Sequence, residues 1–152
     1  MSLSSIIPFW FQPAASTKIW FQKNIQKKQE LDRWITNEYY PLLNDLEEIP
    51  FLDLLTTYSM DECVSIIICL DQFSRHIYRG SDTKQGIIYK NTLKSLQIAN
   101  YLCYSKKIDS IDERYIPFIL MPYKHVDIVT YFKHIHSILE NKGMIDSLFY
   151  KD

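Results

Sequence analysis

The chain has 152 residues, 47% of them apolar and 23% charged, which is the composition of one globular domain and excludes a largely disordered protein. The 17 basic and 18 acidic residues nearly cancel, so the composition excludes a strongly basic protein that coats nucleic acid or binds membranes electrostatically. The glycines are Gly80, Gly86 and Gly143, whose positions exclude a glycine-rich dinucleotide or phosphate loop.

Aromatic residues are concentrated near the N-terminus, at Phe9–Phe11 and Trp20–Phe21. Such groups usually fix a terminus in the core, and we expect that role here. Apolar residues then recur at helical spacing from about Lys27 to Leu46. Pro41 should kink this helix or divide it, because proline lacks the amide hydrogen that an α-helix needs.

The central part of the chain begins with a capping box, in which Ser59 is followed by Glu62 three residues later. Apolar residues spaced by three and four predict a helix over residues 63–77, and Gly80 is the expected C-terminal cap. A further helix is expected between Lys84 and Tyr104.

The last third of the chain repeats the capping-box pattern at residues 110–113, which predicts a short helix that stops before Pro122. A final helix is expected over residues 127–140, ending near Gly143. Because no segment alternates with period two, the sequence predicts an all-α domain of roughly five to seven helices. Antiparallel helix pairs, packed as a bundle or a short superhelix, are the expected architecture, and the sequence shows no internal repeat.

The cysteines Cys63, Cys69 and Cys103 are odd in number and lie among apolar residues, which predicts buried free thiols in a reducing compartment. Cys63 and Cys69 are about 240° apart around a helix and make poor co-ligands, so we predict no metal site. No apolar run approaches the ~20 residues of a membrane span, and residues 1–10 lack the basic start of a signal peptide. We therefore expect a cytoplasmic protein without a membrane segment.

Polar residues interrupt the central apolar stripe at Asp71, Arg75 and Arg79, which are spaced by four and should form one line on the helix. Three interpretations remain open. The line is a partly buried ion-pair network, a site where arginines grip a phosphate or carboxylate, or an ordinary surface salt bridge.

His125 and Asp127 flank the start of the last helix, where a histidine beside an acid acts either as a general base or as a capping residue. His134 and His136 point about 200° apart on a helix and do not chelate one metal. Ser74 lacks the glycines of a nucleophile elbow. Because the aromatic residues are not interleaved with basic ones, nucleic-acid binding is not expected.

Residues 70–81 read Leu-Asp-Gln-Phe-Ser-Arg-His-Ile-Tyr-Arg-Gly-Ser. This segment resembles the signature Leu-Asp-Gln-Phe-Pro-Arg-Asn-(apolar)-aromatic-Arg-Gly-Thr of the family called "domain of unknown function 924". Residues 122–127, Pro-Tyr-Lys-His-Val-Asp, are similar to its second motif, Pro-Phe-Glu-His-Ser-Glu. The aromatic groups near the N-terminus resemble the opening of the family, and the likeness extends from Ile7 to about Leu139.

The resemblance implies an all-helical fold with a tetratricopeptide-like arrangement and an activity that is not established. It also implies a set of motif residues that face a ligand between two helices: Asp71, Gln72, Arg75, Arg79, Gly80, His125 and, as a shorter acid, Asp127.

The sequence departs from the family pattern at Ser74, His76, Lys124 and Val126. Lys124 reverses the charge of a glutamate, which would remove any carboxylate chemistry at that position. Family members continue with a helix that carries Phe-Gly-Arg-Phe-Pro-His-Arg-Asn, and this chain ends at Asp152 without it. We therefore expect a reduced member of the family, with an apolar face left for self-association or a protein partner.

Two functional hypotheses follow. The favoured one is a tetratricopeptide-like interaction or adaptor module that presents a groove to a peptide or subunit. The alternative is a small enzyme or a binder of a small anionic ligand, without a cofactor. In it Arg75 and Arg79 hold the phosphate or carboxylate, His125 acts as acid and base, and Asp71 orients one of these side chains. Gln72 and Asp127 would complete that site. Convergence of Asp71, Arg75 and His125 would favour the alternative.

Overall fold

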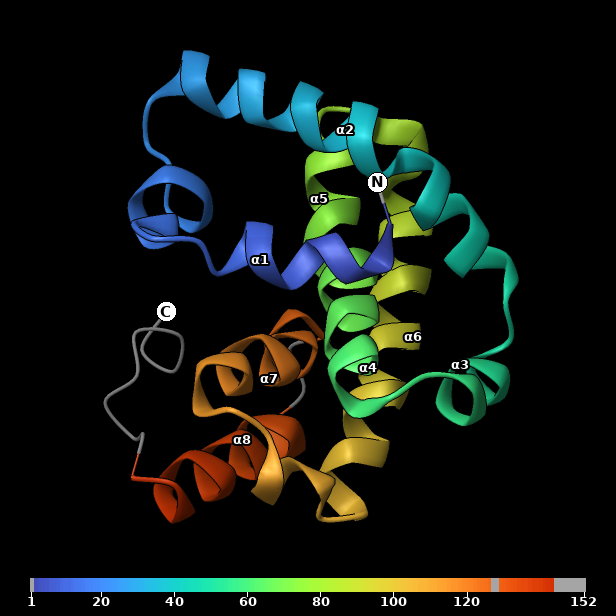
Figure 1. Cartoon of the computed structure of the whole chain (residues 1–152), viewed down its shortest axis with the longest axis vertical. Coiled ribbons are helices and arrows are strands. Elements are labelled where there is room, and N and C mark those ends of the chain that lie inside the picture. Colours follow the sequence, from blue (N-terminus) through green and yellow to red (C-terminus); the bar gives the residue numbers. More distant parts are fainter. Residues whose placement is uncertain (1, 127–128, 144–152) are drawn as a thin grey trace.

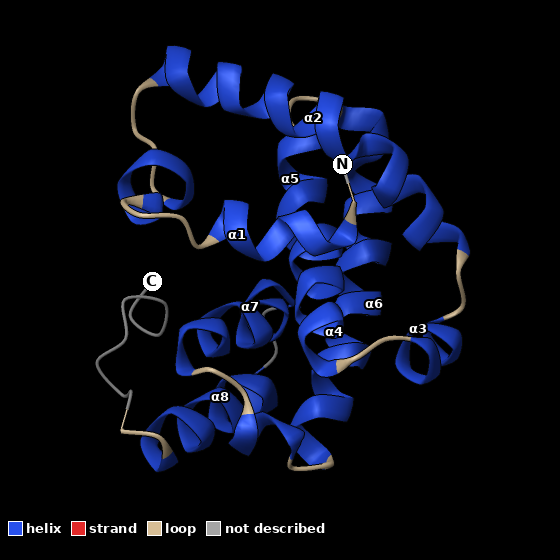
Figure 2. Ribbon diagram, viewed as in Figure 1, coloured by secondary structure: helices blue, strands red, loops and turns tan. Residues whose placement is uncertain are grey.

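The computed structural model describes residues 2–126 and 129–143. Every regular element in this part of the chain is helical, which confirms the all-α prediction (Figure 2). The α-helices are α1 (Ile6–Trp10), α2 (Ile25–Glu48), α3 (Phe51–Thr57), α4 (Met60–Ile67), α5 (Ser74–Ile77), α6 (Gln85–Tyr104), α7 (Ile116–Val126) and α8 (Val129–Asn141). The tetratricopeptide-like pairing implied by the family resemblance stays a prediction.

A continuous helical rod runs through the middle of the molecule (Figure 1). It consists of α4, the π-helix η3 (Ile68–Phe73) and α5, joined end to end. α2 crosses one end of the rod, α6 lies alongside it, and α7 and α8 lie at the other end (Figure 1). Because the rod is surrounded on several sides, its apolar residues form the centre of the core, and Ile66, Ile67 and Leu70 have no exposed surface.

The rod begins where the capping box predicts. The Ser59 Oγ accepts a hydrogen bond from the Glu62 amide at 3.3 Å, and a Glu62 carboxylate oxygen accepts one from the Ser59 amide at 3.0 Å. The rod ends at Ile77, and Gly80 closes the following turn with a φ of +79°, in the left-handed region that favours glycine.

The π-helix was not predicted by the periodicity of the sequence. A π turn adds one residue to a helix turn and is frequent at functional sites. Here it contains Asp71 and Gln72, and it is followed by Ser74, whose hydroxyl donates to the Leu70 carbonyl at 2.6 Å.

The N-terminal aromatic residues anchor the terminus in the core, as predicted. Trp10 is 1% exposed and packs edge-on against Phe73 and Phe118, with ring centroids 5.6 and 5.5 Å away. The Trp20 indole donates a hydrogen bond to the Trp10 carbonyl at 3.0 Å, which fixes the turn η2 (Ser16–Trp20) over α1.

One expectation about proline is wrong, and another is wrong in part, since Pro41 does not divide its helix. Pro41 lies inside α2, which continues undivided from Ile25 to Glu48. Pro122 lies inside α7 and does not stop it. α7 is apolar on most sides and Pro122 itself is buried, so the packing of this helix outweighs the single backbone hydrogen bond that the proline removes.

The second capping box is also misplaced. Ser110 ends the short turn η5 (Lys107–Ser110), and the cap is supplied by Asp112, whose carboxylate accepts from the Arg114 amide at 2.9 Å. That cap opens a 3₁₀ turn, η6 (Glu113–Tyr115), which leads into α7. Asp112 caps η6 because it directly precedes this turn, whereas Ser110 is the last residue of η5.

The predicted ranges of the remaining helices agree with α6 and α8, and Gly143 ends α8 with a φ of +69°. Cys63, Cys69 and Cys103 are free thiols, the first two buried, and burial raises the pKa of Cys103 to about 11. Within the described ranges no helix is both long enough and apolar enough to cross a bilayer.

Candidate functional site

The buried carboxylate of Asp71 is the centre of the polar network. Asp71 is 0% exposed, and the π turn directs it toward α6 and the end of α7. It accepts contacts from four donors: His125 Nδ1 at 2.8 Å, Gln72 Nε2 at 3.1 Å, Arg75 at 3.4 Å and Thr92 Oγ1 at 3.5 Å. These donors satisfy the hydrogen-bonding capacity of a carboxylate that is buried away from water.

The contacts of His125 define its tautomer. Its Nδ1 lies 2.8 Å from Asp71 and 3.3 Å from Arg75 Nε, and the arginine nitrogen is always a donor. One ring nitrogen cannot donate to Asp71 and accept from Arg75 at once. Because the contact to the buried carboxylate is the shorter one, we assign a proton to Nδ1.

Arg75 joins the network around Asp71 through a terminal nitrogen of its guanidinium, Nη2. Its guanidinium donates to Thr92 Oγ1 at 2.9 Å as well as to Asp71, so the side chain is fixed between α5 and α6. Asp71, Arg75 and His125 therefore converge from three helical elements within hydrogen-bonding distance, which is the arrangement that the alternative hypothesis required.

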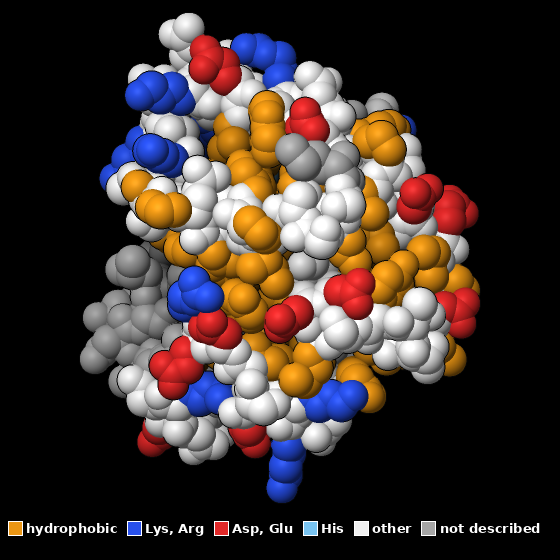
Figure 3. Space-filling view, viewed as in Figure 1, with side chains coloured by type: hydrophobic (Ala, Val, Ile, Leu, Met, Phe, Trp, Pro, Cys, Tyr) orange, Lys and Arg blue, Asp and Glu red, His pale blue; other side chains and the backbone are white. Residues whose placement is uncertain are grey.

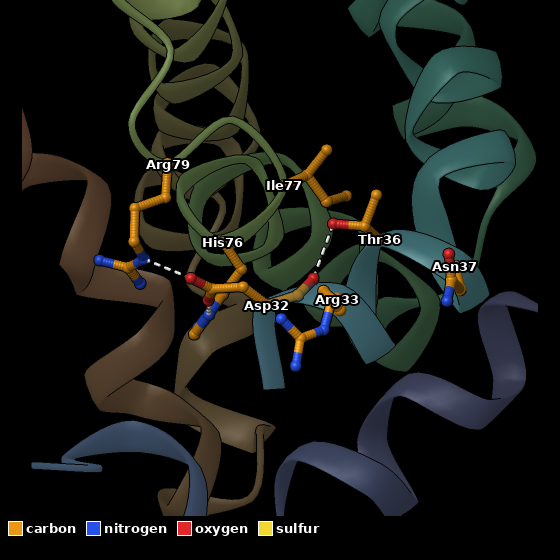
Figure 4. A pocket seen from close by; sticks show the side chains of 7 residues that line it. All are labelled: Asp32, Arg33, Thr36, Asn37, His76, Ile77 and Arg79. Atoms are coloured by element: carbon orange, nitrogen blue, oxygen red, sulfur yellow. Dashed lines mark hydrogen bonds and ion pairs between the residues drawn. The ribbon is translucent and has the colours of Figure 1, made fainter. Parts of the chain in front are cut away.

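Arg79 does not continue the polar line. α5 ends at Ile77, so Arg79 lies beyond the helix and its Nε donates to Asp32 Oδ2 on α2 at 2.7 Å. His76 Nδ1 donates to the other oxygen of Asp32 at 2.6 Å (Figure 4). The prediction of one line through Asp71, Arg75 and Arg79 is thus correct for the first two residues and wrong for Arg79.

Asp32 is held as a carboxylate by these two neighbours. Burial acts to raise the pKa of Asp32, but the hydrogen bonds and positive charges of His76 and Arg79 together outweigh burial and lower it below 3.8. Only 15% of the Asp32 side chain and 10% of the His76 side chain are exposed, so water screens the contact between the two side chains weakly.

A hollow of about 180 Å³ lies between η2, the start of α2, and the η3–α5 part of the rod. We call it the basic hollow, and its lining consists of Ile19, Trp20, Gln22, Lys28, Gln72, Arg75, His76 and Arg79. None of these described residues is acidic. The basic hollow brings together Gln72, Arg75 and Arg79, which the motif singled out, with Lys28 and His76, which it did not.

His125 lies on the other side of Arg75. It lines a separate hollow of about 190 Å³ together with Arg75, Gln85, Ile88, Tyr89 and Thr92. Arg75 borders both hollows, whereas Arg79 and His125 do not share one. Asp127, the remaining predicted site residue, lies outside the described residues.

The contributions of Lys28, Asp32 and Thr92 were missed by the sequence analysis. Lys28 and Asp32 are four apart and share a face of α2, but the sequence does not show which face of α2 packs against the rod. That contact depends on tertiary packing, for which a single sequence gives no direct signal.

The chain matches a known protein family over most of its length. The model of the family described as "Bacterial protein of unknown function (DUF924)" matches residues 6–145. The chain belongs to this family. No curated protein and no solved structure matches the chain.

Two positions at which this DUF924 protein departs from the signature have defined contacts. Ser74, where the signature has proline, accepts a hydrogen bond from Asn91 Nδ2 at 2.9 Å in addition to donating to Leu70. His76, where the signature has asparagine, bonds to Asp32. The departures therefore add hydrogen bonds that tie the rod to α6 and to α2.

Proposed function

We propose that this DUF924 protein binds a small anionic ligand, through a phosphate or carboxylate group, in the basic hollow. The observation that carries the proposal is the lining, in which Lys28, Arg75, His76 and Arg79 surround one space without an acidic side chain. Arginine forks bind planar or tetrahedral oxyanions through charge-assisted hydrogen bonds, which are the stronger class of hydrogen bond in proteins.

The two arginines are held in place before any ligand arrives. Arg75 is fixed by Asp71 and Thr92, and Arg79 is fixed by Asp32. Such fixed side chains lose less conformational entropy on binding than free ones do, which raises affinity. The surface supports the same site, because Lys and Arg side chains gather over η2 and the start of α2 (Figure 3).

A second candidate function, an enzyme that uses His125 as a general acid and base, is favoured by one distance. His125 Nδ1 lies 2.8 Å from the buried Asp71, and an aspartate in this position fixes the tautomer and stabilises the charged ring when it takes up a proton. Arg75 lies between His125 and the basic hollow, so an anion on Arg75 would be close to both.

The interaction module remains a prediction, as does self-association. Figure 3 shows apolar side chains gathered below α1, where α7 and α4 lie, which is the kind of surface that a protein partner covers. The described residues do not identify an occupant for it, so the proposal rests on the basic hollow.

The test is a thermal-shift and calorimetric titration with inorganic phosphate and with succinate, against sodium chloride of equal ionic strength. A ligand present at a hundred times its Kd adds about 2.7 kcal/mol of stability. For a domain of this size that raises the Tm by roughly 5–10 °C.

Arg79→Gln should abolish the shift, because it removes a cation from the hollow. Arg114→Gln is the matched control, since Arg114 pairs with Asp112 on the surface and does not line the hollow. The proposal would be refuted if neither phosphate nor succinate raised the Tm, or if Arg79→Gln and Arg114→Gln reduced the shift equally.

A further inference from the structure

A larger hollow of about 280 Å³ adjoins the basic hollow (Figure 4). We call it the polar hollow, and its lining consists of Asp32, Arg33, Thr36, Asn37, His76, Ile77 and Arg79. His76 and Arg79 line both hollows, so these two side chains form a shared wall. A ligand held by Arg79 on one side therefore has space beside it on the other.

The charges of the two hollows differ. The basic hollow has no acidic residue among its described lining, whereas Asp32 belongs to the lining of the polar hollow. The carboxylate of Asp32, whose lowered pKa keeps it ionised, offsets one of the two arginines in this lining, Arg33 and Arg79. The polar hollow therefore carries less positive charge than the basic hollow and attracts a second anionic group less. A neutral group that donates hydrogen bonds would be attracted to this carboxylate.

Asp32 has the capacity to accept such donors. Each of its oxygens accepts one hydrogen bond, from His76 and from Arg79, and a carboxylate offers about four acceptor positions in all. Asn37 adds an amide that both donates and accepts, and it lies on α2 four residues after Arg33 (Figure 4). These groups match hydroxyls, which donate and accept in the same way.

We propose that the ligand has two parts: an anionic head, phosphate or carboxylate, in the basic hollow and a neutral body with several hydroxyl groups in the polar hollow. A sugar phosphate or a sugar acid has this chemistry. The space is adequate, because about 280 Å³ equals the share of roughly nine water molecules in liquid water. This inference rests on the proposed function, and it adds the class of ligand.

The experiment compares ligands that share a head and differ in the body. Calorimetry with inorganic phosphate, ethyl phosphate and glucose 6-phosphate measures the effect of the hydroxyls, and propionate with gluconate repeats the comparison for a carboxylate head. We expect glucose 6-phosphate to bind at least tenfold more tightly than ethyl phosphate, or gluconate to bind at least tenfold more tightly than propionate.

Asn37→Ala locates the body. The loss of one hydrogen bond should weaken binding of the hydroxylated ligand about threefold to tenfold and leave inorganic phosphate unchanged. Asn44→Ala is the matched control, because Asn44 is exposed on the same helix and lines neither hollow.

Failure of the inference and failure of the proposed function give different results. If phosphate binds and depends on Arg79, but glucose 6-phosphate binds no better and Asn37→Ala changes nothing, the two-part ligand is refuted and the anion site stands. If no phosphate or carboxylate compound binds, both are refuted.

Discussion

The Nδ1 of His125 and a carboxylate oxygen of Asp71 lie 2.8 Å apart, although 54 positions separate the two residues in the chain. This contact joins the π turn of the central rod to the end of α7. Its partners, Arg75 and Thr92, add α5 and α6 to the same network. The polar network is therefore a structural connection as well as a candidate site.

Asp71→Asn should destabilise the protein by about 2 kcal/mol, because the charge-assisted contacts to Arg75 and His125 are lost at a buried position. Urea denaturation measures the change. Asp45→Asn, at an exposed position of α2, is the control and should stay within about 0.5 kcal/mol of the wild type. Equal effects of the two substitutions would show that the Asp71 network adds no stability.

Asp32 should make the stability depend on pH in the acid range. Its pKa is lower in the folded protein than the ordinary value of 3.8, so the unfolded chain takes up the proton first as the pH falls. Its contribution is complete above about pH 5 and decreases as the pH falls through 3.8 and below the folded pKa. The difference in unfolding free energy between wild type and Asp32→Asn should therefore shrink between pH 5 and pH 3. A constant difference would contradict the ion pairs with His76 and Arg79.

The two capping positions should respond differently to substitution. Ser59→Ala removes half of a capping box and should cost about 1 kcal/mol. Ser110→Ala should cost less, because Ser110 does not cap a helix and its hydroxyl only donates to the Lys107 carbonyl. Chemical denaturation of both variants measures the difference, and a larger loss for Ser110→Ala would contradict the helix starts described above.

The thiols should react slowly in the folded protein. Burial raises the pKa of all three cysteines, and with a pKa of about 11 only on the order of a thousandth of Cys103 is thiolate at pH 8. We expect little alkylation by iodoacetamide at pH 8 in an hour, and complete alkylation of three thiols in 6 M guanidinium as the control, where mass spectrometry counts the adducts. Rapid labelling of Cys69 in the folded state would contradict its position in the core.

The sequence predicts the helices well where apolar spacing and a cap agree. The range 84–104 contains the whole of α6, and Ser59 caps the start of α4, because both signals are local. Prediction fails where tertiary packing decides. Pro122 is accepted inside α7 because this helix is buried.

In the candidate site, too, the sequence predicts contacts within one helix and does not predict contacts between helices. Asp71 and Arg75 are four residues apart on the rod, and their spacing predicts their contact. The helix ends at Ile77, and the Arg79 side chain bonds to Asp32 instead. Asp32 comes from another helix, and nothing in its own segment marks it as a partner of the motif. The convergence of Asp71, Arg75 and His125 is the condition that favours the alternative hypothesis, and the structure meets it.

The π turn also affects how insertions and deletions would act on this protein. Deleting one residue between Ile68 and Phe73 would restore ordinary α-helical geometry while leaving α4 and its cap unchanged. Because the π turn already holds one residue more than an α turn, the shortened helix would complete the same turn with 3.6 residues, and the later residues of the rod would keep their direction relative to α4. Loss of one codon there would thus remove the widened turn that contains Asp71 and leave Arg75 directed toward Thr92, whereas loss of one codon in α4 would rotate every later residue of the rod by about 100°.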